Sequence, residues 1–161
     1  MVVLVAVASK HGSTEEIAAF VGDHLRGRGM EVIRAEASEA SLDGVDAAVI
    51  LSGVYAGRWL GPATHFIQDH FDALTKMPVW LISSGPVGDD PPPVDELVRI
   101  GDLPEQLGAV AHWVVAGRID MDLLGFAERA LIRALKVEAG DYRDWDEVTA
   151  CAESIADHLL A

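Results

Sequence analysis

The feature that most constrains this fold is the alternation of short apolar runs with amphipathic helical patterns along the whole chain. Residues 2–8 and 46–51 are almost continuously apolar, as in strands buried on both faces of a parallel sheet. Further strands are expected at 31–35, 78–83 and 109–116. Because such alternation implies right-handed crossovers, the sequence predicts a doubly wound α/β fold, with five parallel strands in the order 2-1-3-4-5 and helices on both faces. The length of 161 residues fits a single domain over residues 1–161.

Amphipathic helices are expected between and after these strands. They run from residue 13 to about 27 or 29, from about 62 to 74, from 94 to about 108, from 123 to 135 and from 145 to about 160. Two helix starts have the spacing of a capping box, Ser13 with Glu16 and Asp144 with Glu147.

The turn after the first strand, residues 9–14, is the first candidate for a binding site. A strand, a hydroxyl-rich turn and a helix aim backbone N–H groups and a helix N-terminus at an anion. The capping box at Ser13 would satisfy the same helix start without any ligand, so both interpretations remain open. The turn lacks the Gly-Lys-Ser/Thr ending of a P-loop, and Gly12 stands alone where a dinucleotide fingerprint has three glycines. A mononucleotide phosphate therefore fits better than either.

Three loops rich in serine and glycine follow predicted strands, at residues 9–14, 52–59 and 83–89. In the predicted strand order these loops converge at the carboxyl edge of the sheet, where ligands bind in open parallel sheets. The first loop offers groups for a phosphate, and the second offers Tyr55 and Trp59 as flat apolar surfaces. Tyr55 is the better candidate for a ring face, whereas Trp59 fits a core anchor equally well. A planar ring with a phosphate on a short tail, such as FMN, would fill this cleft.

The motifs of these loops resemble the FMN loops of the flavodoxin family, particularly its branch similar to menaquinone-dependent protoporphyrinogen oxidase (protoporphyrinogen IX dehydrogenase). They read Ser-Lys-His-Gly-Ser-Thr at 9–14, Ser-Gly-Val-Tyr-Ala-Gly-Arg-Trp at 52–59 and Ser-Ser-Gly-Pro-Val-Gly at 83–88, and residues 140–146 also resemble that branch. The resemblance implies that the FMN phosphate is held by Ser9, Lys10, His11, Gly12, Ser13 and Thr14. It implies that the ring is lined by Ser52, Gly53, Val54, Tyr55, Ala56 and Gly57, with Arg58 and Trp59 completing the motif, and on the other side by Ser84, Gly85, Pro86, Val87 and Gly88.

The resemblance also implies a tuning position, because in flavodoxin-like proteins the backbone beside the flavin N5 adjusts the reduction potential, and Gly57 is the candidate for that place. His11 fits either a phosphate contact or an exposed turn residue. Glu15 and Glu16 stabilise the helix start, but their charge would oppose a phosphate placed near them.

The charge balance limits the partners. Twelve Lys and Arg residues against 26 Asp and Glu give a formal net charge of −14. This disfavours nonspecific binding to nucleic acid or to an anionic membrane, suits basic partners and disfavours the anionic, fully reduced flavin. A basic stripe of Arg129, Arg133 and Lys136 departs from this balance. It fits a solvated face, or contact with porphyrin propionates, an acidic redox partner or anionic lipid, which leaves peripheral membrane contact open.

The remaining features bear on location and chemistry. No apolar run approaches the roughly 20 residues of a transmembrane helix, and the single Cys151, on the apolar face of the last helix, suits a reducing compartment, so a cytoplasmic protein is expected. His65 and His70 are about 140° apart around a helix, which gives no metal site.

Two functions lead, an FMN-dependent oxidoreductase acting on quinone- or porphyrinogen-type molecules, and a flavodoxin-type electron carrier that needs only a redox partner protein. A cofactor-free partner-binding module remains a third alternative, and the oligomeric state stays open. A phosphorylated receiver domain is disfavoured, because Ala8-Ser9 and Leu51-Ser52 stand where its acidic residues belong.

Overall fold

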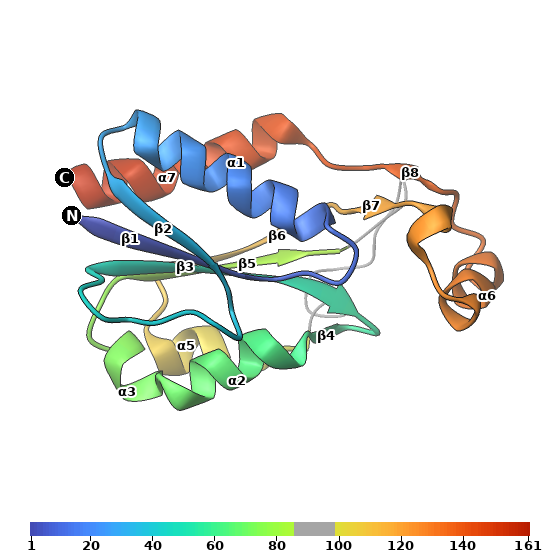
Figure 1. Ribbon diagram of the computed structural model, residues 1–161, viewed down its shortest axis with the longest axis horizontal. Helices are drawn as coiled ribbons and strands as arrows, with labels where there is room; N and C mark the ends of the chain where they lie inside the picture. The colour runs from blue at the N-terminus through green and yellow to red at the C-terminus, as the bar shows by residue number, and fades with distance from the viewer. Residues whose placement is uncertain (86–98) are drawn as a thin grey trace.

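The computed structural model describes residues 1–85 and 99–161, and a parallel sheet forms its centre (Figure 1). The strands of this sheet are β1 (Val2–Ala8), β2 (Glu31–Glu36), β3 (Ala47–Tyr55), β5 (Val79–Ser84) and β6 (Ala111–Val115). They are parallel and lie in the order β2-β1-β3-β5-β6, which confirms the predicted fold class and strand order.

Helices cover both faces of the sheet. On one face lie α1 (Ser13–Gly27) and α7 (Trp145–Leu160), and on the other α2 (Gly61–Asp69), α3 (Phe71–Leu74) and α5 (Leu103–Leu107) (Figure 1). Successive side chains of the central strands alternate between the two resulting cores: Val3 and Val5 pack towards α1 and α7, and Leu4 and Ala6 towards α2. The apolar runs are continuous because each strand has a core on either side.

Two local features differ from the prediction. The helix expected over 62–74 is divided at His70, whose φ of −114° and ψ of 15° leave the helical region. Strand β3 runs further than expected and turns back into β4 (Arg58–Trp59), with Tyr55 paired antiparallel to Arg58. The two turn residues, Ala56 and Gly57, have φ of 50° and 75°, as in a two-residue hairpin turn of the primed type.

Between β6 and α7 the chain leaves the sheet and forms a small separate unit. It contains β7 (Arg118–Ile119), the 3-10 turn η1 (Met121–Leu123), α6 (Phe126–Ala134) and β8 (Gly140–Asp141), and β7 pairs antiparallel with β8. Helix α6, described over its whole length, has no buried residue and projects from the right of Figure 1. The predicted helix over 123–135 is thus confirmed in its main part.

The last helix also matches the prediction. The Asp144 carboxylate accepts hydrogen bonds from the Asp146 and Glu147 N–H groups, at 3.0 and 3.3 Å, and caps α7. Cys151 on this helix is buried. Within residues 1–85 and 99–161, no helix is long and apolar enough to cross a bilayer.

Candidate functional site

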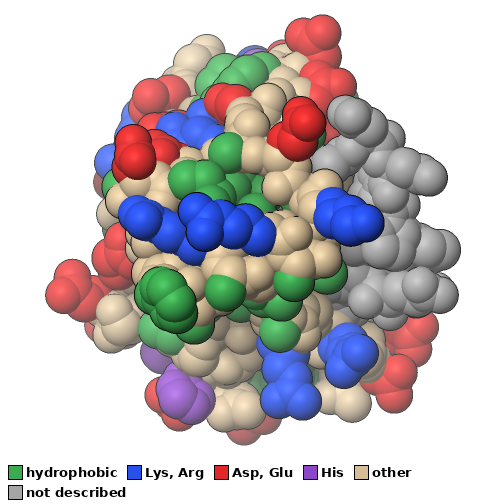
Figure 2. Space-filling model, turned by 90° about the vertical axis from the view of Figure 1, so that its right-hand side faces the viewer, with side chains coloured by type: hydrophobic (Ala, Val, Ile, Leu, Met, Phe, Trp, Pro, Cys, Tyr) green, Lys and Arg blue, Asp and Glu red, His purple; other side chains and the backbone are tan. Residues whose placement is uncertain are grey.

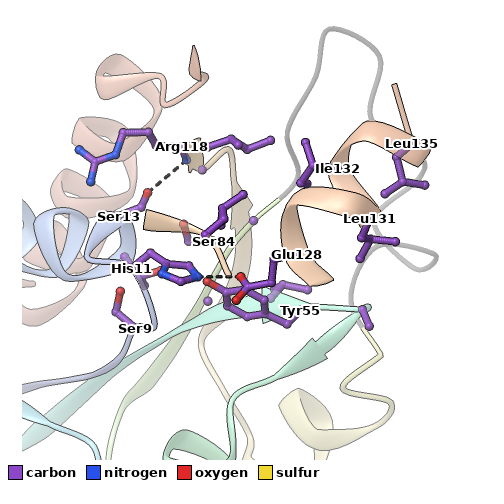
Figure 3. A pocket seen from close by; sticks show the side chains of 18 residues that line it. Ser9, His11, Ser13, Tyr55, Ser84, Arg118, Glu128, Leu131, Ile132 and Leu135 are labelled. Carbon is purple, nitrogen blue, oxygen red and sulfur yellow. Dashed lines mark hydrogen bonds and ion pairs between the residues drawn. The ribbon is translucent and has the colours of Figure 1, made fainter. Parts of the chain in front are cut away.

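A cavity of about 370 Å³ opens at the carboxyl edge of the sheet (Figure 3). It lies where the turn after β1, the end of β3 and the end of β5 meet, so the predicted convergence of the loops is observed. The predicted site residues that line it are Ser9, His11, Ser13, Thr14, Gly53, Val54, Tyr55, Ala56, Ser84 and Gly85.

The N-terminus of α1 points into this cavity without a side-chain cap. Gly12 is the N-cap residue, at a φ of 87°, and no side chain among the described residues caps the helix. Ser13 is the first helical residue, and its Oγ accepts a hydrogen bond from the Arg118 N–H at 3.2 Å. The capping box predicted at Ser13 is therefore wrong. The N–H groups of this first turn have no intrahelical acceptor, which makes the turn a site for an anion.

The acidic residues of the same turn are neutralised by arginines from elsewhere in the chain. Glu15 forms an ion pair with Arg34 on β2. Glu16 forms ion pairs with Arg143 and, at 3.2 Å, with Arg118. The Arg143 hydrogen bond holds the pKa of Glu16 below its usual range. Because both carboxylates are paired, their expected opposition to a phosphate is largely offset.

A second charged group lies in the wall of the cavity. The Glu128 carboxylate on α6 contacts Lys10 Nζ through one oxygen and His11 Nε2 through the other, each at 2.7 Å. Figure 3 shows the contact with His11. Hydrogen bonds from Lys10 and His11 lower the pKa of Glu128. His11 is thus neither an exposed turn residue nor free to reach an anion by itself. The contacts of Glu128 with Lys10 and His11 connect α6 to the turn after β1.

Tyr55 lies beside this group and presents an aromatic surface to the cavity. Its ring is edge-on to His11, with 6.1 Å between centroids, and Lys10 Nζ is 5.3 Å from its centroid. Burial, with a smaller effect from the charge of Glu128, raises the pKa of Tyr55 to about 12. The phenol is therefore neutral in the physiological range.

Gly85 is required by packing within the protein. A Cβ at this position would lie 2.9 Å from Val54 Cβ, 3.2 Å from Val54 O and 3.3 Å from Val54 N. The end of β5 can therefore lie against the end of β3 only because residue 85 has no side chain. This contact places the Val54–Tyr55 segment at the cavity.

Several predicted site residues do not line the cavity. Trp59 is a core anchor: it is 6% exposed, and its indole N–H donates to Ser83 Oγ at 2.7 Å. Ser52 is buried, accepts from the Leu60 N–H at 3.0 Å and donates to the carbonyl of Gly53. Both side chains stabilise the hairpin through these hydrogen bonds and do not face the cavity.

The backbone and flanking positions differ as well. The Gly57 carbonyl accepts a hydrogen bond from the Arg99 N–H at 2.6 Å. Of the two hairpin-turn residues, Ala56 lines the cavity and Gly57 does not in the described part of the chain. Arg58 is exposed and, like Lys10 and Gly12, does not line the cavity in the described part of the chain. The predicted contacts of Pro86, Val87 and Gly88 lie outside the described residues.

The rest of the lining comes from the unit between β6 and α7 and was missed from sequence. These residues are Gly117, Arg118, Ile119, Leu124, Glu128, Leu131, Ile132 and Leu135. Gly117 follows β6 at the same edge of the sheet, so the rule that identified the other three loops also applies to it. Figure 3 shows Leu131 and Ile132 on α6, and Leu135 at its end, on the side of the cavity away from the strands. The cavity therefore has hydroxyl groups at one end and an apolar wall at the other.

Comparisons with known proteins agree with this architecture. The family model described as "Flavodoxin domain" matches residues 4–146. Among solved structures, a flavodoxin from the domain Archaea is similar with a TM-score of 0.65 and 16% identity over the whole of both chains. The flavodoxin of Streptococcus pneumoniae TIGR4 has a TM-score of 0.60 and 19% identity over 99% of this chain and 98% of its own. Oxidised Flavodoxin 1 from Bacillus cereus has a TM-score of 0.53 and 17% identity over 84% of this chain and 95% of its own. At these identities the likeness shows the fold. No curated protein matches the sequence.

Proposed function

Because the chain belongs to the flavodoxin domain family, whose members are FMN-binding flavoproteins, we propose that the cavity at the end of β1, β3 and β5 holds FMN for electron transfer. The observation that carries this proposal is the uncapped start of α1, with both of its carboxylates paired to arginines. The residues present fit the cofactor, since one end of the cavity suits a phosphate and the other an apolar ring.

The binding roles are assigned by position. The N–H groups of the first turn of α1, with the hydroxyls of Ser9, Ser13 and Thr14, would hold the phosphate. Tyr55 and the Val54 side chain would contact the ring, and the peptide between Ala56 and Gly57 would be the tuning position. When bound, FMN supplies the redox chemistry, and these residues bind it, orient it and set the charge around it.

The two candidate functions, an oxidoreductase and an electron carrier, give the apolar side of α6 different roles. The apolar wall of Leu131, Ile132 and Leu135 adds a surface that the three cofactor loops do not provide. Such a wall supports an oxidoreductase that binds a second apolar molecule beside the flavin, and the resemblance to protoporphyrinogen IX dehydrogenase suggests a quinone or porphyrinogen. A carrier acting with a basic redox partner is the second candidate, supported by the net charge of −14. The buried single thiol of Cys151 supports a cytoplasmic location.

The first experiment is the visible absorption spectrum of the purified protein before and after FMN is added. We expect flavin bands that are lost in Gly12→Asp, because this change places a carboxylate at the anion site. Gly29→Asp is the control and should keep them, because it adds the same charge at a φ of 91° with no neighbour within 4 Å. A colourless protein that binds no added FMN would contradict the proposal.

A turnover assay then separates the two candidates. Oxidation of protoporphyrinogen with a quinone acceptor under anaerobic conditions is expected only for the enzyme. Reduction of the flavin by a partner, without turnover of these molecules, would favour the carrier.

A further inference from the structure

The segment around α6 exposes an unusual amount of apolar surface. Half of the large apolar side chains that are exposed in the described part of the chain lie in this segment: Leu123, Phe126, Leu131 and Leu135. Phe126, at the start of the helix, is 91% exposed. A fully exposed phenylalanine that packs on nothing marks a surface for a partner better than a lone leucine does.

Positive charge gathers on α6 and just after its end, in a strongly acidic protein. Arg129, Arg133 and Lys136 form no ion pair within residues 1–85 and 99–161, whereas most other cations there are paired with carboxylates. Arg129 instead donates to the carbonyl of Met121 at 2.9 Å. The cations of α6 are thus available to an external anion.

Helical spacing places these two kinds of side chain together. Residues 126, 129 and 133 are separated by three and four positions, so Phe126 and the two arginines share one side of α6. The leucines that line the cavity lie on the other side. Figure 2 looks onto this end of the molecule and shows Lys and Arg in a band across the middle, with hydrophobic side chains beside them and acidic ones mainly towards the edge.

We propose that the α6 face, defined by Phe126, Arg129 and Arg133 together with Lys136 just beyond the end of the helix, docks on the surface of an anionic phospholipid bilayer. Such a surface offers phosphate groups to the cations and an apolar layer to the aromatic ring at the same time. A polar acidic protein would leave Phe126 in water. The net charge of −14 opposes a second copy of the chain and an anionic bilayer alike, so docking on lipid rests on the local cations, which act within about one Debye length of the surface.

The test is cosedimentation of the purified protein with two kinds of vesicle, pure phosphatidylcholine and an equal mixture of phosphatidylcholine and phosphatidylglycerol. We expect binding to the anionic vesicles only, weakened by salt. Arg133→Gln with Lys136→Gln should lower the partition coefficient about 30-fold, from about fivefold for each cation near the surface. Arg26→Gln with Lys76→Gln makes the same change in net charge elsewhere and should alter it less than about twofold.

Phe126→Ser tests the apolar part, with Leu160→Ser as its control at another exposed site. The first should weaken binding by about tenfold, because the ring no longer enters the interface, and the second should not. Equal effects of the two double variants, or no binding to anionic vesicles at low salt, would overturn the proposal. So would a loss that needs the cations but not Phe126, since that result indicates electrostatic adsorption without insertion of the ring. The flavin absorbance of every variant, measured in parallel, keeps lipid docking separate from cofactor binding.

Discussion

Replacing Gly85 by alanine should move the hairpin that lines the cavity. The added Cβ would lie 2.9 Å from Val54 Cβ and 3.2 and 3.3 Å from the Val54 carbonyl oxygen and nitrogen. Real Cβ atoms do not approach so closely, and two of the three contacts are to backbone, so the ends of β3 and β5 must separate. Overpacking of this kind costs about 1–3 kcal/mol of unfolding free energy. Because the displaced segment contains Tyr55, FMN affinity should fall by about tenfold.

Urea unfolding of the apoprotein and FMN titration measure the two effects separately. Gly27→Ala is the control, since its Cβ meets nothing within 4 Å; it should leave FMN affinity unchanged and, at the last residue of α1, raise the unfolding free energy by at most about 1 kcal/mol. In a double-mutant cycle, Val54→Gly, which removes the Cβ at 2.9 Å, should recover part of the loss in Gly85→Ala, with a coupling of about 1 kcal/mol. Recovery should be incomplete because the backbone contacts remain. Equal unfolding free energies for Gly85→Ala and Gly27→Ala would refute the reasoning.

Three further predictions concern single side chains. Thr14→Val should weaken FMN binding by about one to two orders of magnitude in a fluorescence titration while the apoprotein keeps its stability, because Thr14 lines the cavity and its hydroxyl makes no hydrogen bond within the described residues. Equal affinities would remove Thr14 from the phosphate site. Burial lowers the pKa of His112 below its ordinary value, so its contribution to stability is complete above about pH 6.5 and is lost as the pH falls towards the folded-state pKa. His112→Gln should flatten the acid side of a stability profile from urea unfolding, and the exposed His65→Gln should not. Burial, with a smaller effect from the charge of Glu147, raises the pKa of the Cys151 thiol to about 11. A thiol reagent at pH 8 should therefore label Cys151 only when urea is added. Rapid labelling of the folded protein would contradict the burial of this thiol.

The strand order could be predicted from sequence because each central strand is buried on both faces and is apolar along its length. The cap at Asp144 could be predicted for a related reason, since its partners lie two and three residues away. Such local patterns are complete within a few residues and need no knowledge of the rest of the chain.

The errors about the site depend mostly on contacts between distant segments. The capping box at Ser13 fails because Gly12, at positive φ, takes the N-cap position, and because Arg118 and Arg143, more than 100 residues away, engage Glu16. No local pattern reveals that competition. Trp59 was open between cofactor and core, and its hydrogen bond to a serine on another strand places it in the core.

The wall formed by α6 shows the same limit in another way. Its sequence predicts an amphipathic helix, but an amphipathic pattern does not say what the apolar side faces. Here the direction follows from the contact of Glu128 with Lys10 and His11, which lie nearly 120 residues earlier. The one sequence signal for this contact was the acidic Glu128 beside the basic stripe of Arg129, Arg133 and Lys136.

Helix α6 contributes no buried residue to either core, although it forms one wall of the cavity. Substitutions on it therefore change what the cavity accepts without a corresponding loss of fold stability. Most proteins must trade a new specificity against the stability of the scaffold that carries it. In this chain the two are assigned to different segments, so descendants of a duplicated gene could diverge in substrate or partner through α6 alone while keeping the same cofactor scaffold.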